Sequence, residues 1–78
     1  SEMAMPMTDG VVRAIDRSAG TITVEHGPIK DLDMPAMTMP YHVKDRGMLT
    51  AVKPGDKIKM SVDKMGDSYT ITDLQHVH

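Results

Sequence analysis

Regularly spaced turn residues divide this chain of 78 residues into short segments, and this division constrains its fold more than any other feature. Glycine, proline, serine and aspartate gather at the predicted turns, which lie at residues 17–20, 53–56 and 64–67, and Gly27-Pro28 breaks a strand. Between the turns, apolar and polar residues tend to alternate. The alternation is strict in 21–26, where Ile22, Val24 and His26 share one face. The pattern predicts short β-strands joined by tight turns.

We expect five strands, over residues 10–16, 21–26, 34–43, 57–63 and 68–74. Pro35 and Pro40 fall within the third strand. Because proline cannot donate to a sheet ladder, this strand is expected to lie at an edge or to be interrupted. A helical turn fits only in residues 44–53, where Gly47 limits its length. The predicted fold class is all-β, a small closed or partly open barrel, because an open sheet would leave a face that so short a chain cannot cover.

The chain divides into a lead-in and one domain. Residues 1–8 (SEMAMPMT) follow neither the strand nor the helix period, so we expect a flexible lead-in or linker, and residues 9–78 form the domain. No secretory signal is recognisable, so we expect a mature or excised piece. No apolar run approaches the roughly 20 residues of a membrane helix, so we expect no direct membrane insertion.

Methionine supplies an unusual share of the apolar side chains. There are nine methionines, with no cysteine, phenylalanine or tryptophan, and leucine, isoleucine and valine together make up 15 residues. Methionine is a flexible filler for a core that lacks aromatic rings, and its thioether is also a soft metal ligand. The two interpretations have to be separated position by position.

Several function classes fit the composition poorly. The formal net charge is −2, and Tyr41 and Tyr69 are the only aromatic side chains apart from histidine, so we expect no nucleic-acid partner. No Ser/His/Asp or Cys/His set, phosphate-binding glycine loop or flanking carboxylate pair is present as a motif. We therefore expect the protein not to be an enzyme.

One set of residues stands out as a candidate site. His26 takes the inward position that follows Ile22 and Val24, where an apolar side chain would be expected. Met37 and Met39 share a face of a later strand, about 6.7 Å apart, so their sulfurs can converge. If the two strands are antiparallel neighbours, the imidazole lies within reach of both thioethers. The alternatives are a core histidine bonded to a carbonyl or water, and two methionines that only pack.

Neutral thioethers with one imidazole favour a soft ion of low charge. Cu(I) or Ag(I) fits this ligand set, whereas Mg²⁺ and Ca²⁺ prefer oxygen and zinc favours cysteine or several histidines. In an oxidising compartment, a pair of thiolates risks forming a disulfide, but a thioether keeps its lone pairs available. The hypothesis is a soft-metal site without cysteine.

The other methionines and histidines are expected to lie outside this site. The methionines expected in the core or in turns are Met48, Met60 and Met65. Those in the lead-in, which could form a second thioether cluster but more simply belong to a mobile segment, are Met3, Met5 and Met7. Among the histidines, the expectation is a solvated side chain for His42 and a polar tail for His76 and His78.

Three motifs resemble the CusF family of periplasmic Cu(I)/Ag(I)-binding domains. They are HGPI at 26–29, MPAMTM at 34–39 and KPGDKI at 53–58, and the similarity extends from about residue 10 to residue 74. The resemblance implies a five-stranded OB-like β-barrel in the periplasm that binds one Cu(I) or Ag(I) ion.

The resemblance also implies which residues bind the ion. The family's ligand histidine falls on His26, and its two ligand methionines fall on Met37 and Met39. Where the family usually has a tryptophan that covers the metal through a cation–π contact, this chain has Met34. Met34 is either a fourth ligand or swings free and leaves a three-coordinate site. We expect partial or labile involvement, because Pro35 stiffens its link to the Met37 strand.

The implied partners are components of heavy-metal efflux pumps of the resistance-nodulation-division (RND) type, namely the adaptor and the inner-membrane transporter. Family members occur as free chaperones and as the C-terminal domain of the adaptor, or membrane-fusion, protein. The lead-in favours the fused form, with an isolated domain that is monomeric. The competing hypothesis is an OB-like protein-interaction or single-strand nucleic-acid-binding module with no metal role.

Overall fold

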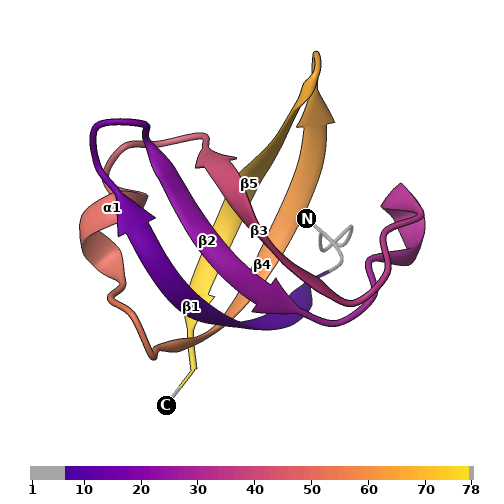
Figure 1. The fold of residues 1–78 in the computed structure, drawn as a ribbon, viewed down its shortest axis with the longest axis horizontal. Coiled ribbons are helices and arrows are strands. Elements are labelled where there is room, and N and C mark those ends of the chain that lie inside the picture. The colour runs from indigo at the N-terminus through magenta and orange to yellow at the C-terminus, as the bar shows by residue number, and fades with distance from the viewer. Residues whose placement is uncertain (1–6, 78) are drawn as a thin grey trace, which may run out of the picture.

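Five strands close into a barrel in the computed structural model, which describes residues 7–77 (Figure 1). In chain order the elements are β1 (Thr8–Asp16), β2 (Thr21–His26), the 3-10 helix η1 (Lys30–Leu32), β3 (Met37–Val43), α1 (Met48–Ala51), β4 (Lys57–Met65) and β5 (Ser68–His76). Around the barrel the strands follow the order β1-β2-β3-β5-β4, and β4 pairs with β1 to complete it. The prediction of an all-β, five-stranded barrel is confirmed.

Only a short pairing between β3 and β5 contributes to the closure of the barrel. Within residues 7–77 the strand pairs are antiparallel except β3–β5, which is parallel and includes only His42 opposite Thr70 and Val43 opposite Ile71. The Lys44 N–H donates to the Ile71 carbonyl at 2.9 Å. Because amide directions alternate along a strand, the backbone of Pro40 faces this same side. A residue without an N–H therefore lies at an edge position, as predicted.

The third strand begins later than predicted. We expected it from residue 34, but β3 starts at Met37, and Met34 forms an isolated bridge with Ile29. The Ile29 N–H donates to the Met34 carbonyl at 2.9 Å, and the Met34 N–H donates to the Ile29 carbonyl at 3.1 Å. Asp33 closes η1 between them in a left-handed conformation with φ of 53°. Pro35, with its fixed φ and missing N–H, separates this small loop from β3.

The chain ends differ from expectation in two further ways. β1 begins at Thr8, the last residue of the predicted lead-in, and residues 1–6, with Met3 and Met5, lie outside the described part. β5 continues past its predicted end at residue 74 as far as His76, which pairs with Ile58. The expectation that His76 belongs to a polar tail is wrong, because its Nε2 lies 3.1 Å from an Asp56 carboxylate oxygen. His78 lies outside the described residues.

The three predicted turns and the short helix are found, although β4 continues to Met65, two residues past its predicted end. Residues 17–20 form a turn, a proline-glycine turn precedes β4, and a tight hairpin joins β4 to β5. Gly55 has φ of 95° and Gly66 has φ of 64°, a region that glycine enters without steric cost. The helical turn expected within residues 44–53 is α1, whose Leu49 is 2% exposed.

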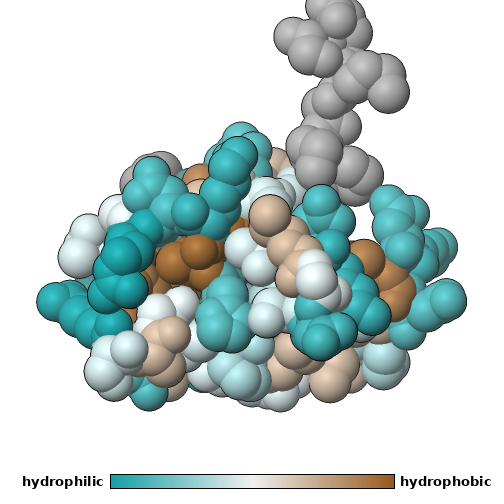
Figure 2. Space-filling model, turned by 90° about the horizontal axis from the view of Figure 1, so that it is seen from above, coloured by the Kyte–Doolittle hydropathy of each residue, from teal (hydrophilic) through white to brown (hydrophobic). Residues whose placement is uncertain are grey.

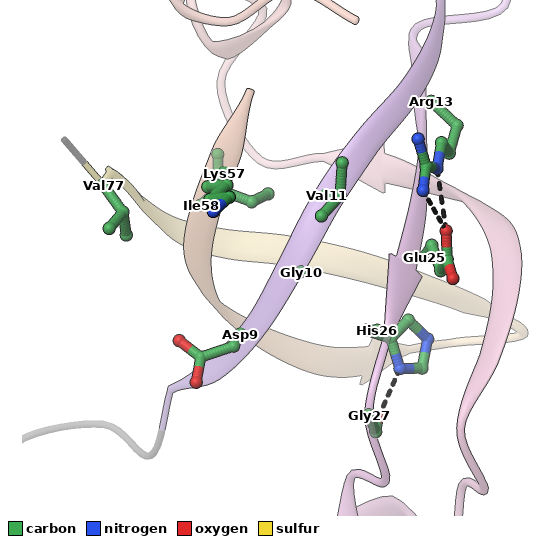
Figure 3. Close-up of a pocket in the computed structure, with 10 residues that line it drawn as sticks. All are labelled: Asp9, Gly10, Val11, Arg13, Glu25, His26, Gly27, Lys57, Ile58 and Val77. Carbon is green, nitrogen blue, oxygen red and sulfur yellow. Dashed lines mark hydrogen bonds and ion pairs between the residues drawn. The ribbon is translucent and has the colours of Figure 1, made fainter. Parts of the chain in front are cut away.

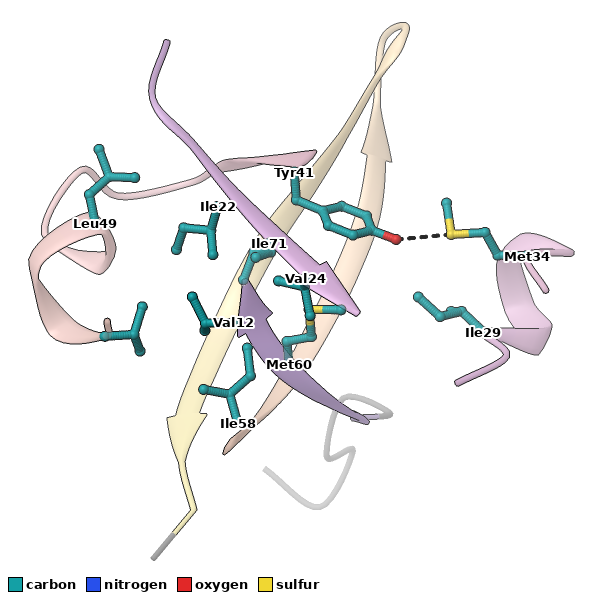
Figure 4. Packing of buried hydrophobic residues seen from close by; sticks show 11 residues of the cluster. Val12, Ile22, Val24, Ile29, Met34, Tyr41, Leu49, Ile58, Met60 and Ile71 are labelled. Carbon is teal, nitrogen blue, oxygen red and sulfur yellow. Dashed lines mark hydrogen bonds between the residues drawn. The ribbon is translucent and has the colours of Figure 1, made fainter. Parts of the chain in front are cut away.

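The core runs through the barrel and continues into both ends (Figure 4). Hydrophobic residues that are 1% exposed or less come from all five strands: Val12, Ile22, Val24, Tyr41, Ile58, Met60 and Ile71. Full burial of such a side chain contributes about 1.5–3 kcal/mol. Met60 is therefore core filler, as expected, and the barrel has an apolar interior built from its own strands.

The outer surface is mainly polar. On the face shown in Figure 2, hydrophilic residues predominate and strongly hydrophobic ones show between them. Among the described residues, the large hydrophobic side chains classed as exposed are Met37 at 38%, Met65 at 54% and Val77 at 36%. No helix in the described part of the chain is both long enough and apolar enough to cross a membrane.

Candidate metal centre

Pairing between β2 and β3 brings the predicted ligands together. The strands are antiparallel, with His26 opposite Met37 and Val24 opposite Met39. Directly opposed residues point to the same face with Cβ atoms about 4.5–5.5 Å apart, and the diagonal neighbour also lies within reach of a long side chain. His26, Met37 and Met39 therefore share one face at one mouth of the barrel. The predicted neighbourhood of these two strands is confirmed.

Gly10 fixes the position of His26 from the other side. It pairs with His26 across β1 and β2. A Cβ atom at Gly10 would lie 2.6 Å from Val24 Cγ1 and 3.1 Å from the Glu25 carbonyl oxygen. Only glycine allows β1 to approach this closely. Sequence reasoning missed this role, although a glycine at the start of a strand was the available signal.

Both ring nitrogens of His26 have partners. The side chain is 5% exposed, with Nδ1 2.6 Å from the Gly27 carbonyl oxygen and Nε2 2.5 Å from the Tyr41 hydroxyl. A carbonyl oxygen only accepts, so Nδ1 carries the hydrogen and the lone pair of the neutral ring is on Nε2. Metal-binding histidines commonly donate their other N–H to such a carbonyl. The ring is thus oriented to offer Nε2 as a ligand.

Tyr41 connects two of the candidate ligands. Its ring is fully buried in the core, 5.5 Å from the His26 ring between centroids. Its hydroxyl also contacts Met34 Sδ at 3.1 Å (Figure 4). Burial, with a smaller contribution from the charge of Tyr69, raises the pKa of Tyr41 to about 12, so the phenol stays neutral near pH 7. Alternation along residues 34–43 puts Tyr41 on the face of Met37 and Met39, but these contacts were not predicted.

Met34 points into the barrel mouth rather than away from it. Its side chain is 8% exposed, and it belongs to the core cluster together with Ile29, also 8% exposed. The paired backbone hydrogen bonds with Ile29 hold its main chain, and Tyr41 contacts its sulfur. Three sulfurs and one imidazole therefore lie around the same mouth, with Met34 on the loop and the other three residues on β2 and β3.

The two methionines of β3 differ in exposure. Met37 is 38% exposed at the start of the strand, whereas Met39 is partly buried against the core. An ion or a partner molecule can thus reach the Met37 side of the mouth from solvent.

A separate pocket of about 450 Å³ lies next to His26 (Figure 3). Its lining includes His26 and Gly27 and an Arg13–Glu25 ion pair at 2.5 Å, but none of the methionines. A single ion held by side chains does not need a pocket of this size. Strand register and hydrogen bonds therefore define the candidate metal site, and this pocket does not.

Of the other histidines within residues 7–77, His76 lies beside Asp56. His42 is exposed, as expected for its position on the outer face of β3. Within residues 7–77, no group of three or more His, Cys, Asp or Glu side chains is arranged to hold a metal ion.

The fold is a small five-stranded barrel, and the site is an imidazole with thioethers at one mouth, which is a donor set for a soft metal ion. Comparison with known proteins identifies the family. The sequence model described as "Copper binding periplasmic protein CusF" matches residues 5–76. The chain belongs to this family.

The comparisons with individual proteins agree with this assignment. The cation efflux system protein CusF of Escherichia coli K12 is 30% identical over 66 residues, which cover 85% of this chain and 60% of that protein. The chain thus spans about 60% of the length of the curated relatives it matches. A crystal structure of Ag(I)CusF has a TM-score of 0.75 at 26% identity and covers 92% of this chain and 96% of that one. The structure of apo-CusF from Escherichia coli has a TM-score of 0.74 at 26% identity and covers 100% and 95%, respectively.

Proposed function

We propose that the domain binds one Cu(I) or Ag(I) ion through His26 Nε2 and the sulfurs of Met37 and Met39. The observation that carries this proposal is the register of β2 and β3, which sets His26 opposite Met37 with Met39 next along the same face. The Gly27 carbonyl supports it further, because its hydrogen bond with Nδ1 leaves the Nε2 lone pair to bind the ion.

The donor set favours a soft ion. One neutral nitrogen and two neutral sulfurs suit Cu(I) and Ag(I) better than ions that prefer oxygen. Thioethers need no deprotonation, so only the imidazole makes binding sensitive to acid, through competition with a proton. The description of the family as copper-binding and the Ag(I) complex of CusF support the same choice.

The barrel is expected to fold without the ion, because its core is built from apolar residues of all five strands. Ion binding then adds stability by mass action, about 4 kcal/mol at a thousandfold excess over the dissociation constant. Neutral ligands at an exposed mouth can be exchanged one at a time with the sulfurs of an acceptor protein. The domain would thereby transfer its ion without releasing it into solution, which is a carrier role and not a catalytic one.

We propose the periplasm as the compartment and an RND efflux system as the recipient, through its adaptor and inner-membrane transporter. Family membership supports the compartment, and the name of the relative from Escherichia coli, a cation efflux system protein, supports the recipient. We further propose that the chain corresponds to the C-terminal domain of an adaptor protein, as in SilB, an adaptor of silver efflux. In that form the barrel would act as a monomeric domain tethered to the pump.

Docking to a protein partner is a second candidate function, and the open edge of β3 favours it. Residues 37–41 pair with β2 on one side, and the parallel pairing with β5 begins only at His42. This edge, which has no strand partner within residues 7–77, belongs to the strand of Met37 and Met39, so docking and metal transfer can occur at the same place. Single-strand nucleic acid fits less well, because the ring of Tyr41 is buried and cannot stack on a base.

Titration with Ag(I) tests the proposal, with two exposed methionines as a matched pair. Met37→Leu should weaken binding at least tenfold, since even changes around a metal ligand typically cost about 10- to 100-fold. Met65→Leu, in the β4–β5 hairpin, should bind like the parent. The measurement is a competition titration of each purified domain. Equal affinities for the Met37→Leu variant and the parent would contradict the proposed site.

A further inference from the structure

A single hydroxyl group lies between two of the candidate ligands. The Tyr41 oxygen is 2.5 Å from His26 Nε2 and 3.1 Å from Met34 Sδ. All three side chains are at least nine-tenths buried. Tyrosine has one hydroxyl hydrogen, so it can donate fully to only one of these two acceptors.

The hydrogen bond at the other ring nitrogen of His26 decides which acceptor receives the Tyr41 hydroxyl hydrogen. His26 Nδ1 donates to the Gly27 carbonyl, so in the neutral ring Nε2 has no hydrogen and must accept. The Tyr41 hydroxyl therefore donates to Nε2, and its contact with Met34 Sδ is secondary. The lone pair that receives this hydrogen is the one a metal ion would need.

An ion at Nε2 would displace the tyrosine hydrogen from its acceptor. The hydroxyl is buried, and a buried donor without a partner is unfavourable. Met34 Sδ is already in contact, and the Ile29 bridge holds the Met34 backbone in place. The hydroxyl can therefore turn to the sulfur with little movement of either side chain.

We infer that Tyr41 is a positioning residue with two effects on metal binding: its hydroxyl competes with the ion for His26, and once displaced it bonds to Met34 and keeps that sulfur off the ion. The inference rests on the proposed function. It assigns the ion three ligands, which are His26, Met37 and Met39. It also explains why the buried sulfur of Met34 does not become a fourth ligand. Tyr41 thereby limits both the affinity and the coordination number of the site.

Tyr41→Phe tests the inference, because it removes only the oxygen and keeps the buried ring. The variant should bind Ag(I) about two- to tenfold more tightly than the parent, since one hydrogen bond no longer opposes the ion. A gain of affinity is not expected from a variant that merely loosens the fold. Tyr69→Phe, at the half-buried tyrosine of β5, is the matched control and should bind like the parent.

The methyl signal of Met34 gives a second readout in protein labelled with [¹³C-methyl]methionine. In the parent it should shift much less with Ag(I) than the signals of Met37 and Met39. In Tyr41→Phe it should shift with them, because the released sulfur joins the ion. Adding Met34→Leu to Tyr41→Phe should remove the part of the affinity gain that comes from this sulfur.

The outcomes separate the inference from the function on which it rests. A parent domain that does not bind Ag(I) at one equivalent would overturn both. A parent that binds, with Tyr41→Phe folded but binding equally or more weakly, would overturn the role of Tyr41 alone. A large Ag(I)-induced shift of the Met34 methyl in the parent would also overturn it, and this measurement does not depend on the variant folding.

Discussion

The two ends of the barrel are closed in similar ways but with different chemistry (Figure 1). At one end, α1 contributes Leu49, 2% exposed, and the Arg46 guanidinium donates to the Arg17 carbonyl at the β1–β2 turn. At the other end, the loop that contains η1 contributes Met34 and Ile29, each 8% exposed. Each end is thus covered by a segment that includes a short helix and contributes buried apolar side chains.

The difference lies in what is buried beneath each cover. The α1 end contributes hydrocarbon side chains to the core, whereas the other end buries an imidazole, a phenol and a thioether in contact with one another. Apolar burial at the α1 end contributes only to stability. At the site end the buried groups satisfy one another through hydrogen bonds, and among the candidate ligands Met37 is the exposed one. Substitutions at the two ends should therefore separate stability from metal binding.

The largest expected effect is at the α1 end. Leu49→Ala should lower the free energy of unfolding by about 2–5 kcal/mol, because a buried leucine is replaced by a cavity. Chemical denaturation followed by circular dichroism measures the change. Leu74→Ala, which removes a half-buried leucine of β5, should cost less. The Ag(I) affinity of folded Leu49→Ala should equal that of the parent, and a tenfold loss would show that the ends are not independent.

At the site end, Gly10→Ala should change stability and binding together. The new Cβ would lie 2.6 Å from Val24 Cγ1, and the buried, branched Val24 side chain has little room to move. We expect a loss of about 1–3 kcal/mol, as for other overpacked positions, together with weaker Ag(I) binding as His26 is displaced. Gly27→Ala is the control, since its Cβ would meet nothing within 4 Å. Equal stability of the two variants would contradict the close approach of β1 to β2.

Alkaline titration should distinguish the buried phenol. Because burial raises its pKa from 10.0 to about 12, the Tyr41 absorbance change on ionisation should be centred near pH 12 in the folded domain. The folded state favours the neutral phenol. The resulting stabilisation is therefore complete below the unfolded pKa and is lost as pH rises through the folded value. A Tyr69→Phe variant leaves one tyrosine to follow, and a midpoint near pH 10 while the domain stays folded would show that Tyr41 is not buried.

The smallest expected effect lies outside the site, at the turn before β4. The Lys53 backbone N–H donates to Asp56 at 2.9 Å, and this bond, together with the contact from His76, lowers the pKa of the Asp56 carboxyl below 3.8. A lowered folded-state pKa stabilises the fold above the unfolded value, and the effect is lost as pH falls through the folded value.

Asp56→Asn should therefore be less stable than the parent at neutral pH, and the difference should disappear in acid. Ag(I) binding should not change. Asp63→Asn, at an exposed position of β4, is the control and should show no comparable difference. A stability difference for Asp56→Asn that stays constant down to the most acid pH would contradict the role of the carboxylate.

The strands and the shared face of Met37 and Met39 could be predicted because both depend on local patterns. Alternation with period two defines which residues share a face, and turn residues define where strands end. The strand that contains Met37 and Met39 then has only to pair with the strand of His26 for the three candidate ligands to come together. The barrel closure provides this pairing, with β2 beside β3.

What could not be predicted depends on contacts between distant parts of the chain. The Ile29–Met34 bridge replaces the first residues of the predicted third strand, because Pro35 breaks the alternation that the residue types alone suggested. The Tyr41 hydroxyl reaches His26, 15 residues earlier, only once β2 and β3 are in register. The continuation of β5 to His76 depends likewise on pairing with β4. Sequence periodicity contains no information on these contacts.

The most direct test of the central claim is an Ag(I) titration of domain labelled with [¹³C-methyl]methionine. The methyl signals of Met37 and Met39 should shift together and saturate at one equivalent, with the ring signals of His26 following the same curve. Met48 in α1 and Met65 in the β4–β5 hairpin should not respond. A response of Met65 as large as that of Met37, or no response of the β3 methionines at one equivalent, would contradict a soft-metal site at this mouth of the barrel.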